Sequence, residues 1–101
     1  CGPCEIMLQQ LMANYDAIRQ AGVEVITISA DTDRLTFEDT ASAFPWEQQL
    51  FDGQGFNGDN FVNYGITGTP TLFVADASGR LLRRAVDLPS LLLWLDARQE
   101  K

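Results

Sequence analysis

The sequence of 101 residues predicts a single α/β domain, and three observations lead to that fold class. Two cysteines open the chain as CGPC, directly ahead of a helical pattern. Short apolar runs at 23–30 and 71–76 alternate with further helical patterns, as in α/β proteins. A Thr-Pro pair stands just before the second of these runs. A chain of this length buries one modest core, so we expect one domain over residues 1–101.

The first predicted element is a helix that runs from the cysteines to Ala21 and Gly22. Pro3 suits its first turn, where the missing N–H costs nothing, and Gly22 suits its end. Its apolar positions recur at the period of one helical face: Met7, Leu11, Tyr15 and Ile18. This pattern predicts a helix with one buried side.

A buried strand is predicted over 23–30, because this run is short, β-branched and bounded by Gly22 and an Asp-Thr-Asp sequence. A second helix is predicted over 34–44, with early fraying and an end at Pro45. Residues 45–60 form a long loop with a short extended piece at 49–51. A loop of this length in a small domain is usually functional or packed under its aromatic side chains.

The last part of the chain predicts a short helix, a hairpin and a final helix. The short helix ends at Gly65 and is capped by Asp59 or Asn57. The runs 71–76 and 80–86 should pair antiparallel through a turn that contains Gly79. Asp87 should cap the final helix, which has Pro89 in its first turn and ends near Arg98. Its apolar face consists of Leu88, Leu91, Leu92 and Leu95.

Composition excludes several classes of function. The sequence has no histidine, which removes Ser-His-Asp and Cys-His catalysis and every histidine-based metal site. Two cysteines are too few for a structural zinc site, so we expect no metal and no bound cofactor. A formal charge of −7 disfavours nucleic acid as a partner. No stretch approaches the roughly 20 apolar residues of a membrane span, so we expect no membrane insertion within this segment.

The CGPC motif is the strongest candidate for chemistry. A thiol attacks a disulfide as thiolate, and the N–H groups and dipole at a helix N-terminus lower a cysteine pKa. Cys1 is therefore the predicted nucleophile, and Cys4, one turn inside the helix, is the predicted resolving thiol. The alternatives are an inert structural disulfide, half of a metal site, or two cysteines without a special role.

Thr69-Pro70 adds a second signal, because cis X-Pro bonds are retained at particular structural positions. The combination of CGPC, Thr-Pro and the sequence from Trp46 to Leu82 resembles the thioredoxin-like thiol-disulfide oxidoreductases of the TlpA/ResA type, which are found in bacteria. The resemblance covers nearly the whole chain. It implies a thioredoxin-like fold, three-layer α/β/α with a mixed sheet.

The resemblance also assigns roles to individual residues. It implies that Cys1 attacks, that Cys4 resolves, and that Pro70 is a cis-proline whose loop lies against the cysteines. The backbone of Thr69 would pair with the substrate chain as a short added strand. Gly2 and Pro3, between the cysteines, join Thr69 and Pro70 in the implied substrate-binding surface. Two loop aromatics, Trp46 and Phe56, are either part of the rim of this site or core residues.

The chain departs from the family pattern in two respects. Relatives carry a central strand immediately before the CxxC motif, so we expect an N-terminally truncated fold, with a gap between the strands at 23–30 and 71–76. Relatives also often place a glutamate three residues after the second cysteine, with a proline two further on. This sequence has Met7 and Gln9 there. Glu5 stands where many relatives have a basic residue.

The resulting expectation is an enzyme that exchanges its CxxC dithiol or disulfide with protein disulfides and acts as a reductase. Its partners would be protein disulfide substrates and a redox protein that donates or accepts electrons. The alternative is a non-enzymatic thioredoxin-like binding or scaffolding module of a larger protein. The resemblance implies a periplasmic or otherwise extracytoplasmic address, with a membrane tether in the missing segment as one form of it and the cytoplasm left open.

Overall fold

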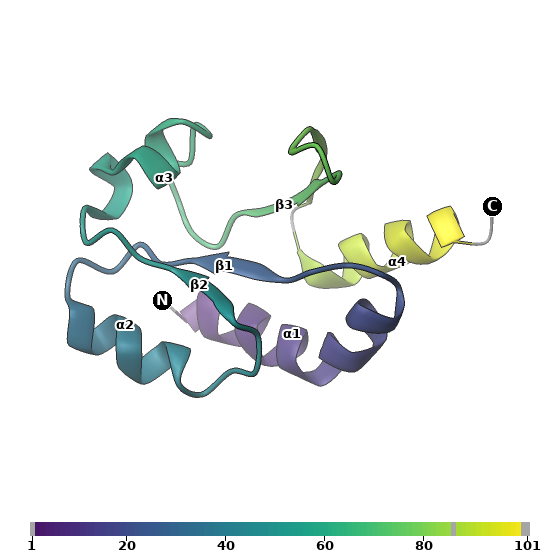
Figure 1. Cartoon of the computed structure of the whole chain (residues 1–101), viewed down its shortest axis with the longest axis horizontal. Helices are drawn as coiled ribbons and strands as arrows, with labels where there is room; N and C mark the ends of the chain where they lie inside the picture. The colour runs from purple at the N-terminus through teal and green to yellow at the C-terminus, as the bar shows by residue number, and fades with distance from the viewer. Residues whose placement is uncertain (1, 86, 100–101) are drawn as a thin grey trace. The chain divides into compact units, whose positions relative to one another are not determined.

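The computed structural model describes residues 2–85 and 87–99, which form two compact units. One, which we call the hairpin unit, contains Cys1–Ala13 and Pro70–Lys101. The other, the parallel-strand unit, contains Asn14–Thr69. The element order is helix, strand, helix, strand, two short helices, hairpin and helix (Figure 1). This order agrees with the sequence prediction, and the short extended piece predicted at 49–51 is a strand at 48–50.

Helix α1 (Gly2–Gln20) contains the last three residues of the CGPC motif and continues without a break through the amphipathic segment. Leu11 and Ile18 are buried on its apolar face, as the spacing predicts. Gly22 adopts a φ of 81°, and its N–H donates to the carbonyl of Arg19 at 2.9 Å. A left-handed glycine of this kind ends the helix where the sequence predicted.

The parallel-strand unit contains β1 (Ile26–Ile28) and β2 (Gln48–Leu50), which pair in parallel and run side by side in Figure 1. Ile26 lies opposite Gln48 and Ile28 opposite Leu50. The prediction of a buried strand over 23–30 was wrong in length and burial, because only three residues pair and Ile26 is 52% exposed. Pairing of the short segment at 48–50 with β1 depends on contacts distant in sequence, which local pattern does not reveal.

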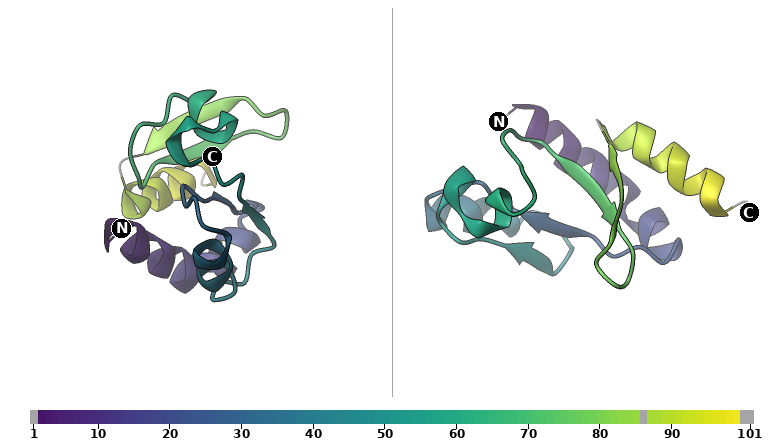
Figure 2. Two further views of the ribbon diagram at one scale, coloured as in Figure 1. Left: turned by 90° about the vertical axis from the view of Figure 1, so that its left-hand side faces the viewer. Right: turned by 90° about the horizontal axis from the view of Figure 1, so that it is seen from above.

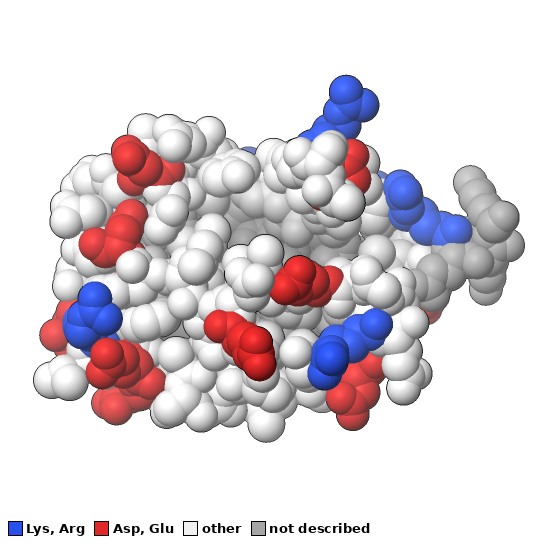
Figure 3. All heavy atoms as spheres, viewed as in Figure 1, with Lys and Arg blue, Asp and Glu red and all other residues white. Residues whose placement is uncertain are grey.

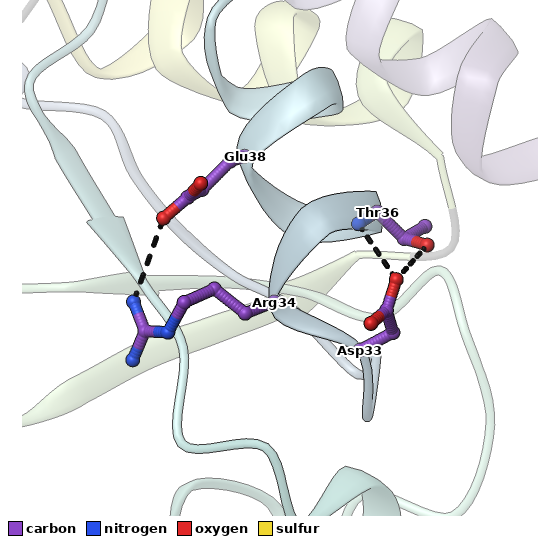
Figure 4. A network of polar contacts seen from close by, with 4 residues as sticks. All are labelled: Asp33, Arg34, Thr36 and Glu38. Atoms are coloured by element: carbon purple, nitrogen blue, oxygen red, sulfur yellow. Dashed lines mark hydrogen bonds and ion pairs between the residues drawn. The ribbon is translucent and has the colours of Figure 1, made fainter.

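Helix α2 (Arg34–Ala41) is capped by Asp33, whose carboxylate accepts bonds from the Thr36 N–H at 3.0 Å and hydroxyl at 2.8 Å (Figure 4). Arg34 lies 3.7 Å from Glu38, one turn further along the helix. The helix ends at Ala41 rather than at residue 44. The chain turns there, and the ring of Phe44 stacks on Trp46 with ring centroids 5.0 Å apart.

The long loop contains a 3-10 turn, η1 (Gly55–Asn57), and a four-residue helix, α3 (Asp59–Val62), which lie together in Figure 2. The cap of α3 is Gly58, with no side-chain hydrogen bond, so the prediction of Asp59 or Asn57 as the cap was wrong. The carboxylate of Asp52 occupies the space where a side chain at position 58 would lie. Phe61 in α3 is only 3% exposed, which anchors this part of the loop.

The hairpin unit contains β3 (Leu72–Ala75) and β4 (Leu81–Ala85), which pair antiparallel as predicted and are seen from above in Figure 2. The register shifts between Val74 and Ala75, as in a β-bulge. Gly79 has a φ of 88° in the connecting turn. The Asp76 carboxylate holds this turn by accepting bonds from the main-chain N–H groups of Ser78 and Arg80, at 3.0 and 2.9 Å.

Helix α4 (Leu88–Gln99) completes the hairpin unit. The Asp87 carboxylate accepts a 2.8 Å bond from the Ser90 N–H, which confirms the predicted cap. Leu88 is fully buried and Leu91 is 7% exposed on the predicted apolar face. Trp94 of this helix lies under two guanidinium groups, from Arg83 and Arg98, whose Cζ atoms are 5.6 and 4.8 Å from the ring centroid.

Among the described residues, β1 and β3 belong to separate two-stranded sheets. The α/β class is confirmed, since parallel and antiparallel strand pairs occur together with helices.

Candidate functional site

The CGPC motif lies at the start of α1 in the hairpin unit. Gly2 and Pro3 are exposed in the first turn, and Cys4 is half-buried behind them. No described cysteine is a free thiol. Cys1 lies outside the described residues, so its pairing with Cys4 and its role as nucleophile stay predictions.

The N-terminus of α1 provides the electrostatic environment that the predicted chemistry requires. The first four N–H groups of an α-helix have no partner within the helix, and the helix dipole adds partial positive charge at that end. Because α1 starts at Gly2, Cys1 precedes it by one residue and Cys4 lies in its first turn. Glu5 is exposed in the same turn, so its charge is screened by solvent.

Thr69 and Pro70 lie in an irregular segment that leads into β3. Pro70 is half-buried and belongs to the hairpin unit together with the first 13 residues of the chain. Thr69 is exposed and is the last residue of the parallel-strand unit. The cis geometry of Pro70 and the pairing of Thr69 with a substrate stay predictions.

The position of the family's acid-base glutamate holds Met7, which is half-buried on α1. Gln9, at the position of the family's proline, is exposed. Neither side chain exchanges protons at neutral pH. A proton acceptor for Cys4 therefore has to come from another residue or from solvent.

Trp46 is a core residue and not part of an exposed rim. Its side chain is 2% exposed, and its indole N–H donates to the Thr27 hydroxyl at 3.0 Å. Tyr15 and Phe44 lie against it, with ring centroids 5.7 and 5.0 Å away. Phe56 is 42% exposed and packs on Phe61 at 5.4 Å. Of the two roles that the sequence left open for Trp46, the core role is therefore the one that the structure shows, as is usual for a large aromatic side chain.

The structure also shows a groove of about 410 Å³ that lies wholly within the parallel-strand unit. Its lining includes the charged and polar side chains of Arg19, Glu24, Glu47 and Gln48. The side-chain amide of Gln48 donates a 3.1 Å bond to the Glu24 carboxylate. Of the residues considered for the site, Trp46 lines it, whereas Gly2, Pro3, Cys4, Thr69 and Pro70 do not.

Charge is divided unequally between the two units. The parallel-strand unit holds two arginines and nine acidic residues, and it therefore carries the whole formal charge of −7. The hairpin unit holds five basic and five acidic residues. Acidic side chains are spread over the face in view in Figure 3 and do not form one patch. The acidic character of the chain therefore does not belong to the unit with the CGPC motif.

The described residues include no group of three or more histidine, cysteine, aspartate or glutamate side chains that could hold a metal ion. In the same part of the chain, no helix has the length and apolar character needed to cross a bilayer.

The chain is similar in sequence to known proteins of one family. A thioredoxin-like family model matches residues 1–81. Mouse nucleoredoxin is 33% identical over 86 residues, which cover 83% of this chain and 20% of that protein. The thiol-disulfide oxidoreductase ResA of Bacillus thuringiensis is 24% identical over 82% of this chain and 47% of that protein. The chain thus spans about a fifth of the length of nucleoredoxin.

The chain is also similar to a solved structure. The crystal structure of a candidate thiol:disulfide interchange protein DsbE from Chlorobium tepidum matches with a TM-score of 0.65 and 26% identity, over 97% of this chain and 71% of that one. The family model, which matches residues 1–81, and this structural match both indicate a thioredoxin-like protein. The chain belongs to the thioredoxin-like family, and its fold is that of the TlpA/ResA-type members.

Proposed function

We propose that this chain is a thiol-disulfide oxidoreductase that exchanges the Cys1–Cys4 dithiol with disulfides of proteins. The observation that carries the proposal is the start of a 19-residue helix at Gly2, directly after Cys1. Membership of the thioredoxin-like family supports the same chemistry, as do the names of two relatives, a thiol-disulfide oxidoreductase and a candidate thiol:disulfide interchange protein.

The reaction proceeds by two exchange steps. The Cys1 thiolate attacks one sulfur of the substrate disulfide, a Cys1–substrate S–S bond forms, and the other substrate sulfur leaves as a thiolate. The Cys4 thiolate then attacks the Cys1 sulfur, and the second substrate sulfur leaves. The substrate gains two electrons, and Cys1 and Cys4 end as a disulfide. A dithiol redox protein returns the electrons by the reverse sequence.

We propose that Cys1 attacks and Cys4 resolves because of their places in the sequence, Cys1 ahead of α1 and Cys4 in its first turn. A thiol beside the unpaired N–H groups of a helix start ionises more readily than one in ordinary solvent. Cys4 is half-buried within the first turn and so is less accessible to a protein substrate. Thr69 and Pro70 would orient the substrate chain, with Gly2 and Pro3 leaving room beside the sulfur.

Net reduction is the direction we propose, because the Gly-Pro pair between the cysteines resembles that of reducing family members. An extracytoplasmic address fits the family, although the relatives come from animals and plants as well as bacteria.

Insulin reduction with dithiothreitol as electron donor tests the proposal. We expect turnover above the uncatalysed rate, loss of that turnover in Cys1→Ser, and accumulation of a mixed disulfide with the substrate in Cys4→Ser. Leu93→Ala serves as the matched control, since this side chain is 73% exposed on α4. Equal rates for the unmodified chain and Cys1→Ser would contradict the proposal and would favour a binding or scaffolding module.

A further inference from the structure

We propose that Asn57 is a site of spontaneous deamidation, which converts it to aspartate and isoaspartate immediately before α3. The proposal does not depend on the redox function. It rests on the sequence Asn57-Gly58, on the geometry at Gly58 and on the contrast with the other asparagines of the chain.

The reaction needs no partner other than water. The main-chain nitrogen of Gly58 attacks the side-chain carbonyl carbon of Asn57, so an N–C bond forms and a five-membered succinimide closes. The bond from that carbon to the side-chain nitrogen breaks, and ammonia leaves with the proton from the Gly58 N–H. Water then opens the ring at either carbonyl, giving aspartate or isoaspartate. Asparagine counts among the thermolabile residues, and deamidation of this kind is a reaction by which it is lost.

Gly58 makes this attack possible because it has no Cβ to obstruct the approach of its nitrogen. Its N–H bond to the carbonyl of Gly55 is 3.3 Å long, beyond the usual range of about 2.7–3.2 Å. Asn57 is exposed at the end of η1. The nitrogen is therefore weakly held, and the side chain that it attacks is accessible to water.

The packing of the loop requires glycine at this position. The Asp52 carboxylate fills the space that a Cβ at residue 58 would need, and Oδ1 of Asp52 also accepts a 2.9 Å bond from the Gln54 N–H. A larger residue after Asn57 would protect the amide but would displace Asp52. The feature that allows the loop to close is thus the same feature that exposes Asn57 to attack.

The remaining asparagines lack this combination, since Asn14, Asn60 and Asn63 are followed by Tyr15, Phe61 and Tyr64. Asn14 and Asn60 are within helices. The nitrogen that follows Asn60 donates to the Gly58 carbonyl at 3.1 Å, within the normal range. These three residues are internal controls in every measurement.

Isoaspartate adds one atom to the main chain directly before the cap of α3. The Gly58 carbonyl accepts bonds from the N–H groups of Phe61 and Val62, at 3.1 and 3.0 Å. An added backbone atom shifts this carbonyl relative to the Asp52 contact and to buried Phe61. Isoaspartate formation should therefore loosen α3, whereas a normal aspartate at position 57 should not.

The test is incubation of the folded chain at mildly alkaline pH and 37 °C, followed by mass spectrometry of peptides and by methylation with an isoaspartyl methyltransferase. We expect a mass gain of about 1 Da in the peptide with Asn57, together with methylation. Peptides with the other three asparagines should not change. Asn57→Gln should abolish both signals, because its longer side chain disfavours ring closure.

Two further samples make the result decisive. Asn57→Asp carries the charge without the added backbone atom, so it should melt like the unmodified chain, while the isoaspartate fraction should melt lower. If the folded chain retains Asn57 while the same chain in urea loses it, or if Asn14, Asn60 or Asn63 reacts as fast, the proposal is wrong.

Discussion

The indole N–H of Trp46 donates a 3.0 Å hydrogen bond to the hydroxyl of Thr27, which lies in β1. This bond joins the segment before β2 to the strand with which β2 pairs. Trp46 is 2% exposed, so water does not replace the bond if it is lost. Trp46, which the sequence left open between rim and core, is thus a core residue that links the segment before β2 to β1.

Removal of the acceptor should destabilise the chain. Thr27→Val keeps the shape of the side chain but leaves the indole N–H unsatisfied, at a cost of about 1–3 kcal/mol. Urea unfolding followed by tryptophan fluorescence measures this cost. In a cycle with Trp46→Phe, the double variant should lose less than the sum of the two single variants. Additive losses would show that the two residues do not interact energetically.

Leu88 should contribute strongly to stability, because it is fully buried at the start of α4. We expect Leu88→Ala to lower the free energy of unfolding by about 2–5 kcal/mol, the usual cost of such a truncation in a core. Leu93→Ala on the same helix is the matched control. Its side chain is 73% exposed, and we expect a change within about 0.5 kcal/mol. Similar losses in the two variants would contradict this arrangement of α4.

Gly58→Ala should destabilise the loop through contact with Asp52. The φ and ψ of Gly58, −78° and 160°, are accessible to alanine, so the cost comes from packing and not from the backbone. Displacement of Asp52 should cost about 1–3 kcal/mol. Gly68→Ala is the control, since a Cβ there has no heavy atom within 4 Å.

A second substitution tests the cause of that loss. Asp52→Ala combined with Gly58→Ala removes the carboxylate that the new methyl group would meet. The double variant should therefore be no less stable than Asp52→Ala alone. If Gly58→Ala costs the same with and without the carboxylate, the close approach of these two residues is not the reason for the glycine.

Acid should weaken the caps and turn that depend on three aspartates. The side-chain and backbone bonds from Thr36 lower the pKa of Asp33, those from Ser78 and Arg80 lower that of Asp76, and those from Ser90 lower that of Asp87, each from an ordinary value of 3.8. A lowered folded pKa gives stabilisation that is complete above the unfolded value. It is lost as the pH falls through the folded pKa.

Unfolding by urea at several values between pH 6 and pH 2 measures this dependence. A variant with Asn at positions 33, 76 and 87 retains neutral capping side chains but does not titrate there, since Asn is also a good cap. We expect its stability to fall less steeply below pH 4 than that of the unmodified chain. If the free energy of unfolding falls equally steeply with pH in the two proteins, these three carboxylates do not cause the loss of stability in acid.

The sequence predicted the helices and the hairpin because their signals are local. The spacing of apolar residues in α1, the glycine at its end and the Asp87 cap each act within a few residues along the chain. The antiparallel pairing of β3 with β4 also follows from a short turn with Gly79. CGPC and Thr69-Pro70 identified the family by their combination, and the comparisons confirmed it.

Other features depend on contacts between residues far apart in the chain. Local sequence did not reveal that β1 pairs with β2 or that the strand at 23–30 shortens to three residues. It also did not reveal that Gly58, with the Asp52 carboxylate beside it, is the cap of α3. It also left Trp46 undecided between rim and core.

The sequence by itself determined the order of the elements, the family and the residues proposed for thiol exchange. Only the tertiary structure decided which side chains form the core, which strands pair and where glycine is required. The physical reason is the distance along the chain over which the interactions act. A helix cap or a turn depends on residues a few positions away, whereas burial and strand pairing depend on contacts between residues that are far apart in the sequence.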